Sequence, residues 1–127
     1  MGKSMTVQRH EDVLRKLTIR DDDFVQLLLA DDQENLAASG LDPRTHALAR
    51  LAALIAIDAP TPLYLWTVDA ALERGATVDD IVGTLIAVMP AVGSSCVVAA
   101  APKLGVAVGY DVEAALEVLD DESAAAG

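Results

Sequence analysis

At 127 residues, the chain has the length of one domain, and we expect a single domain over residues 1–127. Twenty acidic residues against nine basic ones give a formal charge of −11, which repels nucleic-acid phosphates and anionic membrane surfaces. The charge therefore argues against binding to nucleic acid or to a membrane. Hydrophobic residues make up 53% of this acidic chain but aromatic residues only 3%, a composition that favours closely packed helices.

The cysteine and histidine content argues against disulfides and metal sites. Cys96 is the only cysteine, so the chain cannot form an intrachain disulfide. His10 and His46 lie far apart in the sequence and leave no recognisable zinc-binding spacing. We expect no metal and no cofactor. Because a free cysteine suits a reducing compartment, we expect a cytoplasmic location.

Two helices are predicted in the first part of the chain, residues 1–39. They cover residues 10–17 and 22–30. The second begins at a run of three aspartates, and negative charge suits the positive end of a helix. Residues 35–40 are predicted to form a loop that ends at a glycine, which permits the backbone to reverse.

Two further helices are predicted before residue 76. Asp42 and Pro43 are a strong start signal, because aspartate accepts bonds from free amides and proline fits the first helical position. This helix is expected to reach about Ile57. Thr61-Pro62 repeats the signal, and Gly75 is expected to end the second helix in a left-handed conformation.

The segment from Ile81 to Pro102 contains no charged residue. Thr77 and Asp80 predict a capped helix start just before it, and Pro90 is expected to end or bend that helix. A second helix is predicted over residues 92–108, kinked or split by an internal proline and glycine. The uncharged segment is long enough to cross a membrane, but glycine, serine and proline interrupt it. We expect instead that it is buried inside an oligomer.

The chain is expected to end in a short amphipathic helix, which starts at Val112 and reaches Leu119, and a disordered tail over residues 121–127. No segment shows the alternation of a strand. The pattern predicts an all-α fold of five to seven helices, with its core over residues 40–108.

The stretch Ala70-Ala71-Leu72-Glu73-Arg74-Gly75-Ala76-Thr77, followed by Asp80-Ile81, resembles the carboxymuconolactone decarboxylase family, which includes the alkylhydroperoxidase D-like proteins. The helix start Gly40-Leu41-Asp42-Pro43-Arg44-Thr45 belongs to the same resemblance, which covers residues 40–104. The resemblance implies a single-domain helical bundle of the alkylhydroperoxidase D-like type. It also implies assembly into a homo-trimer or homo-hexamer through a helical hairpin.

The resemblance further implies where the reactive groups of the family would lie. The peroxidase branch would place its Cys-x-x-Cys at Pro60 and Leu63, and both branches would place a histidine at Thr67. None of these positions holds a thiol or an imidazole. Because proline and leucine cannot replace a thiolate couple, we expect no dithiol peroxidase activity.

Three residues of the helix that starts at Asp42 are candidate catalytic residues: Arg44, His46 and Arg50. An arginine can clamp a carboxylate at two points, and a histidine can transfer a proton. The alternative for the arginines is ion pairing with the many acids. The alternative for His46 is a partly exposed surface position.

Cys96 is a candidate nucleophile or peroxide-sensitive thiol, although no cationic residue lies within six positions of it. Its alternative is a buried small hydrophobic residue. Tyr64, Trp66 and Met89 are candidates to line an apolar pocket, and the alternative for them is packing in the core.

Three hypotheses for the function follow. The first is a carboxymuconolactone decarboxylase-like protein of altered chemistry, which binds a small apolar or carboxylate-bearing molecule. The second is a non-catalytic oligomeric scaffold or partner-binding module. The third is a peroxidase that acts through Cys96.

Overall fold

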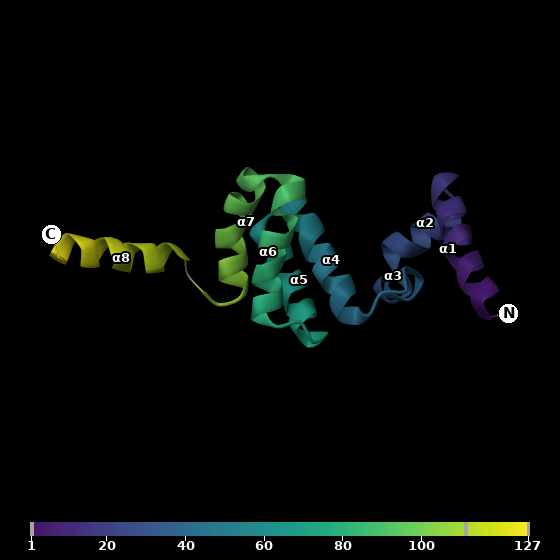
Figure 1. Ribbon diagram of the computed structural model, residues 1–127, viewed down its shortest axis with the longest axis horizontal. Helices are drawn as coiled ribbons and strands as arrows, with labels where there is room; N and C mark the ends of the chain where they lie inside the picture. Colours follow the sequence, from purple (N-terminus) through teal and green to yellow (C-terminus); the bar gives the residue numbers. More distant parts are fainter. Residues whose placement is uncertain (1, 111, 127) are drawn as a thin grey trace. The chain divides into compact units, whose positions relative to one another are not determined.

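A computed structural model describes residues 2–110 and 112–126, and every regular element in this part of the chain is an α-helix (Figure 1). The predicted all-α class is therefore confirmed. The helices are α1 (Gly2–Thr18), α2 (Asp22–Ala30), α3 (Asp32–Ser39), α4 (Pro43–Ala56), α5 (Thr61–Glu73), α6 (Val78–Val92), α7 (Ser94–Ala107) and α8 (Val112–Ala126).

The chain divides into two compact units, Met1–Leu41 and Asp42–Gly127. The division falls close to residue 40, where the sequence predicts the end of the N-terminal helices and the start of the core. Each unit has its own internal contacts, and the chemistry discussed below lies in the second unit.

The first unit consists of α1, α2 and α3, whose starts are set by aspartates. The side chain of Asp21 accepts a bond from the Phe24 amide at the start of α2, and Asp31 does the same for Glu34 at the start of α3. The loop predicted over residues 35–40 is wrong, because this aspartate cap makes most of that segment helical. The Arg9 guanidinium donates to carbonyl oxygens near the end of α3, which ties α1 to α3.

The second unit is built around four helices, in which α4 and α7 each lie beside both α5 and α6 (Figure 1). One side of each helix faces the common core, which is aliphatic apart from one tyrosine. The core residues are Ala47, Leu51, Ile55, Ala59, Tyr64, Val68, Ala71, Ala76, Ile81, Leu85, Val97, Ala100 and Leu104. The predominance of small and branched aliphatic residues allows the four helices to approach closely.

Local signals set the helix ends of this unit as predicted. Asp42 accepts a bond from the Thr45 amide at 3.2 Å, with Pro43 in the first turn of α4. Gly75 ends α5 with a φ of +96°, a conformation that other residues rarely adopt. Thr77 and Asp80 exchange bonds between side chain and backbone, which completes the predicted capping box of α6.

Two prolines lie inside helices of this unit. Pro90 lies inside α6, which continues to Val92 and ends at Gly93, where φ is +89°. Pro102 lies inside α7 and does not split it. Each proline removes only one backbone hydrogen bond, which a helix packed along its length can lose without ending.

The last helix is longer than the sequence predicts. The sequence predicts that this helix ends near Leu119 and that residues 121–127 form a disordered tail. In the structure α8 continues to Ala126. Gly127 lies outside the described residues. Alanine and glutamate are strong helix formers, and the final segment is rich in alanine. The start of α5 also differs from the prediction. This helix begins after Pro60 with no side-chain cap, so Thr61 is a helical residue and not the predicted cap.

Two isoleucines near the end of α4 test the assignment of the core. Ile55 is fully buried and Ile57 is 69% exposed. We expect Ile55→Ala to lower the free energy of unfolding by about 2–5 kcal/mol, because it leaves a cavity in the core. Ile57→Ala is the matched control, and we expect it to change that free energy by less than about 0.5 kcal/mol. Urea unfolding measures both, and equal effects would contradict the described core.

Candidate functional site

Four polar residues gather where α4 and α6 begin and α5 ends. We call Arg44, His46, Arg74 and Asp80 the end cluster. The Arg44 guanidinium holds the Asp80 carboxylate at two points, with Nη2 at 2.8 Å from Oδ1 and Nε at 3.1 Å from Oδ2. Such a two-point pair is the strongest geometry for arginine and carboxylate. It joins the first turn of α4 to the first turn of α6.

Asp80 is the one carboxyl group of the end cluster, and its pKa is strongly lowered. The hydrogen bond from Arg44 and the bond from the Thr77 amide lower the pKa of Asp80 from 3.8 to about 2. Both interactions favour the ionised carboxylate. Asp80 therefore stays charged at any ordinary pH and acts as a fixed anion between two helices.

His46 is the one buried polar residue among the described side chains, with 4% of its surface exposed. Nη1 of Arg74 donates to Nδ1 of His46 at 3.2 Å. A guanidinium can only donate, so Nδ1 must be unprotonated in this contact. The exposed surface position considered for His46 is therefore not found, and the histidine instead links the first turn of α4 to the end of α5.

The third candidate of α4, Arg50, lies one helical turn after His46 and is exposed. A second basic contact is found at the other end of α4. The Lys103 ammonium of α7 donates to Asp58 at 2.8 Å and to the Ala59 carbonyl at 3.0 Å. This contact ties α7 to the turn between α4 and α5.

Tyr64 lies in the bundle core with its whole surface buried, and its hydroxyl has no hydrogen-bond partner. Burial raises the pKa of Tyr64, and the charges of Asp58 and Cys96 raise it further. Cys96 itself is half-buried in the first turn of α7, which packs beside α5. The tyrosine hydroxyl therefore remains protonated and can donate a hydrogen bond.

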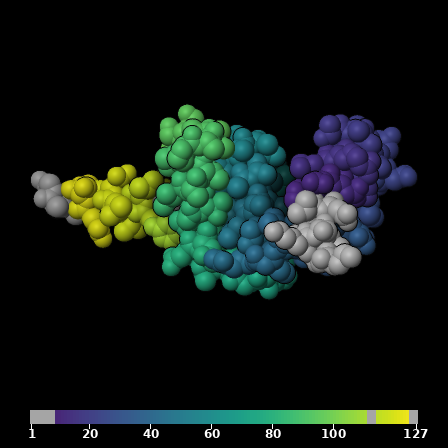
Figure 2. All heavy atoms as spheres, turned by 45° about the vertical axis from the view of Figure 1, so that its right-hand side comes forward, coloured from purple at the N-terminus to yellow at the C-terminus, as the bar shows by residue number. Residues whose placement is uncertain are grey.

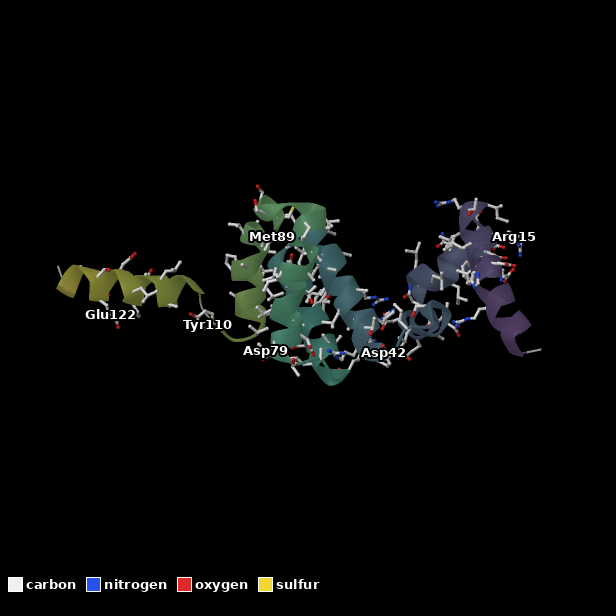
Figure 3. All side chains as sticks on the ribbon, viewed as in Figure 1. Arg15, Asp42, Asp79, Met89, Tyr110 and Glu122 are labelled. Atoms are coloured by element: carbon white, nitrogen blue, oxygen red, sulfur yellow. The ribbon has the colours of Figure 1, made fainter. Side chains whose placement is uncertain are left out.

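The two other predicted pocket residues lie elsewhere. Trp66 is 68% exposed on α5, two residues from Tyr64 and therefore on the other side of the helix. Met89 is partly exposed near the end of α6 that is opposite to Asp79 (Figure 3). The structure thus places Tyr64 in the core and the other two residues on the surface.

Two open hollows lie in the first unit. The larger, of about 570 Å³, is lined by residues of α1 alone, and the smaller, of about 370 Å³, lies between α1 and the end of α3. The residues that line them are Arg9, Glu11, Asp12 and Arg15 for the first, and Arg9, His10, Val13, Leu14, Ala38 and Ser39 for the second. Neither hollow includes a residue of the end cluster.

The described part of the chain contains neither a group of metal ligands nor a helix that could cross a membrane. Within residues 2–110 and 112–126, no three His, Cys, Asp or Glu side chains come together as metal ligands would. Over the same residues, no helix has both the length and the apolar character needed to span a bilayer.

The sequence does not predict the part that Arg74 plays in the end cluster. Arg74 joins the end cluster only because α5 returns antiparallel to α4, which brings residues 28 positions apart into contact. A glycine that ends α5 directly after Arg74 is the local signal that places this arginine at the bundle end.

The Asp80 contacts predict a pH dependence of stability. Because the pKa of Asp80 is lower in the folded chain, its contribution is present above about pH 4 and is lost as the pH falls toward 2. We expect Asp80→Asn to lower the thermal midpoint at pH 7. The gap from the wild type should close between about pH 4 and pH 2. Asp79→Asn, an exposed neighbour, is the control, and a gap for Asp80→Asn that persists unchanged at pH 2 would contradict the ion pair.

No protein-family model, no curated protein and no solved structure matches the chain.

Proposed function

We propose that the chain is a self-associating helical module, a non-catalytic scaffold whose copies meet through one face of α6 and α7. This surface, the hairpin face, consists of Val78, Val82, Ile86 and Met89 on α6 with Val98 and Val106 on α7. All six side chains are exposed, including 69% of Ile86 and 70% of Val98. These exposed apolar side chains, on two helices that pack against each other, are the observation that carries the proposal.

The spacing of these residues makes each helix present one apolar stripe. Val78, Val82 and Ile86 are four residues apart on α6, and Val98 and Val106 are eight apart on α7, so each set lies along one side of its helix. The two helices pack against each other, and α7, drawn in green, lies at the surface of the unit in Figure 2. No charge interrupts the chain from Ile81 to Pro102.

A second copy of the chain is the partner that the charges favour. Each copy carries a formal charge of −11, so two copies repel each other over most of their surfaces. The hairpin face lacks charge along nearly its whole length and permits contact without placing carboxylates opposite one another. A basic partner would instead be drawn to the acidic runs elsewhere on the chain.

The size of the face sets the strength of the contact. A helix of 15 residues is about 22 Å long, and two helices packed about 9 Å apart present a face about 20 Å wide. Such a face has a flat outline of about 400 Å² per copy, or about 800 Å² for two copies, which is less than the roughly 1,200 Å² that stable specific interfaces bury. We therefore propose an association that depends on concentration. The homo-trimer or homo-hexamer that the family resemblance implies fits a surface of this kind.

The polar candidates support a scaffold rather than a catalyst. Arg44 is already bound to the carboxylate of Asp80, and a carboxylate-bearing ligand would have to displace that partner. His46 accepts a bond from Arg74. Both contacts join separate helices, so these residues stabilise the packing of the bundle.

Charge placed on the hairpin face tests this proposal. We expect Ile86→Asp and Val98→Asp each to reduce the mass found by light scattering to 13.3 kDa, because burial of an unpaired carboxylate opposes association. The wild-type chain should have a larger mass at the same concentration.

Ala53→Asp is the matched control, since Ala53 is exposed on α4, outside the hairpin face. It should associate as the wild type does, and circular dichroism should show equal helix content in all variants. A wild-type mass that neither aspartate substitution changes would refute the role of the hairpin face.

A further inference from the structure

The last helix, α8, carries an apolar stripe that stays in water in a single copy. Leu116, Val118 and Leu119 are 56%, 56% and 59% exposed. At about 100° per residue, these side chains and Ala115 span about 160° of the helix circumference. Glu122 follows the stripe, and three further acidic residues lie on the opposite side of the helix: Glu117, Asp120 and Asp121. The helix α8 is therefore amphipathic, with an uncovered apolar side.

The helix α8 has few contacts within its own copy. Among the helices that the structure describes, α7 is the only one that contacts it. A helix of 15 residues is only marginally stable alone in water, and most helices in proteins are stabilised by packing of an apolar side. The stripe of α8 therefore predicts a further surface that covers it.

We propose that α8 of one copy covers the hairpin face of a second copy, and that the second copy returns the same contact. The inference rests on the proposed self-association and names the segment that the hairpin face binds. Leu116 and Leu119 of one copy lie along the line where α6 and α7 of the other copy pack against each other, beside Val82 and Ile86. The acidic side of α8 stays in water.

Charge favours the hairpin face over a second α8 as the binding surface. The helix α8 holds several acidic residues and no basic one, so two such helices repel each other. The hairpin face includes the uncharged segment from Ile81 to Pro102. It can receive the apolar stripe of α8 without placing carboxylates opposite one another.

The structure leaves α8 off the hairpin face of its own copy. The chain leaves α7 in a turn in which the Gly109 amide donates to the Val106 carbonyl at 3.1 Å and the Tyr110 amide donates to the Gly105 carbonyl at 2.8 Å. With this turn formed, α8 contacts α7 but not α6 among the described residues. The α6 half of the hairpin face is therefore left for another copy.

The area of the contact also favours exchange of α8. A helix of 15 residues is about 22 Å long and about 10 Å wide with its side chains, so half of its circumference is about 350 Å². The face that receives it loses a similar area. Two reciprocal contacts bury about 1,400 Å² in total, more than the roughly 1,200 Å² of stable specific interfaces, whereas two hairpin faces in direct contact bury about 800 Å².

Charge placed in the stripe of α8 tests the inference. We expect Leu119→Asp to raise the concentration at which half of the full-length chains associate at least about tenfold, because each contact loses the burial of one leucine. Ala124→Asp, which adds the same charge on the other side of α8, is the matched control and should associate as the wild type does. Sedimentation equilibrium measures both.

The outcomes separate this inference from the proposed self-association. A wild type that stays at 13.3 kDa refutes both. A wild type that associates, with Leu119→Asp associating equally well, overturns the exchange of α8 alone. Stronger association of Leu119→Asp also overturns it, since α8 would then cover the hairpin face of its own copy.

Cross-linking identifies the contact directly. Two full-length chains, one with Ile86→Cys and one with Leu119→Cys, both also carry Cys96→Ser and are treated with a short bismaleimide. We expect the mixture to form a linked pair of chains, and mass spectrometry should find residue 86 joined to residue 119. A pair that forms as readily from the Ile86→Cys chain alone would show direct contact of two hairpin faces and would overturn the inference.

Discussion

The constraint on which the structure depends is that α6 and α7 carry large apolar residues on more than one side, while the bundle covers only one side of each. The covered side supplies Ile81 and Leu85 from α6 and Leu104 from α7 to the core. The other side leaves Ile86 and Val98 in water. Burial of apolar surface is the main favourable term in folding and in association, so the same segment drives both. Association would bury the apolar side chains of α6 and α7 that remain exposed in a single copy.

The polar residues of the bundle fix how the apolar helices are placed against one another. Asp80 caps α6 and binds Arg44 of α4, and thus fixes the start of the uncharged segment against another helix. Lys103 fixes the far part of α7 to the turn that follows α4. An apolar contact sets no register by itself, whereas these bonds have directions and lengths. The few charges inside the bundle therefore position the helices that hydrophobic burial brings together.

Helix starts were the most predictable part of the fold, because a cap is a local interaction between residues three apart. For this reason Asp42 and Thr77 correctly predict where α4 and α6 begin. Pro90 and Pro102 lie inside α6 and α7, since the loss of one backbone bond is offset by packing along the rest of the helix. The helix α3 was missed because its aspartate cap lies in an acidic run that resembles solvated surface.

The candidate sites were predictable only in part. Arg44 and His46 both lie near the start of α4, so the sequence predicts that they lie at the same end of this helix. Their partners Asp80 and Arg74 belong to other helices, and the sequence contains no signal for that pairing. Tertiary packing decides which side chains meet, and it also decides that Trp66 lies outside the core.

The most direct test of the central claim is the mass of the unmodified chain at sedimentation equilibrium, measured over a wide range of concentration. An uncovered hairpin face predicts a mass that rises from 13.3 kDa toward a multiple of that value as the concentration increases. A single species of 13.3 kDa at every concentration would contradict self-association through α6 and α7.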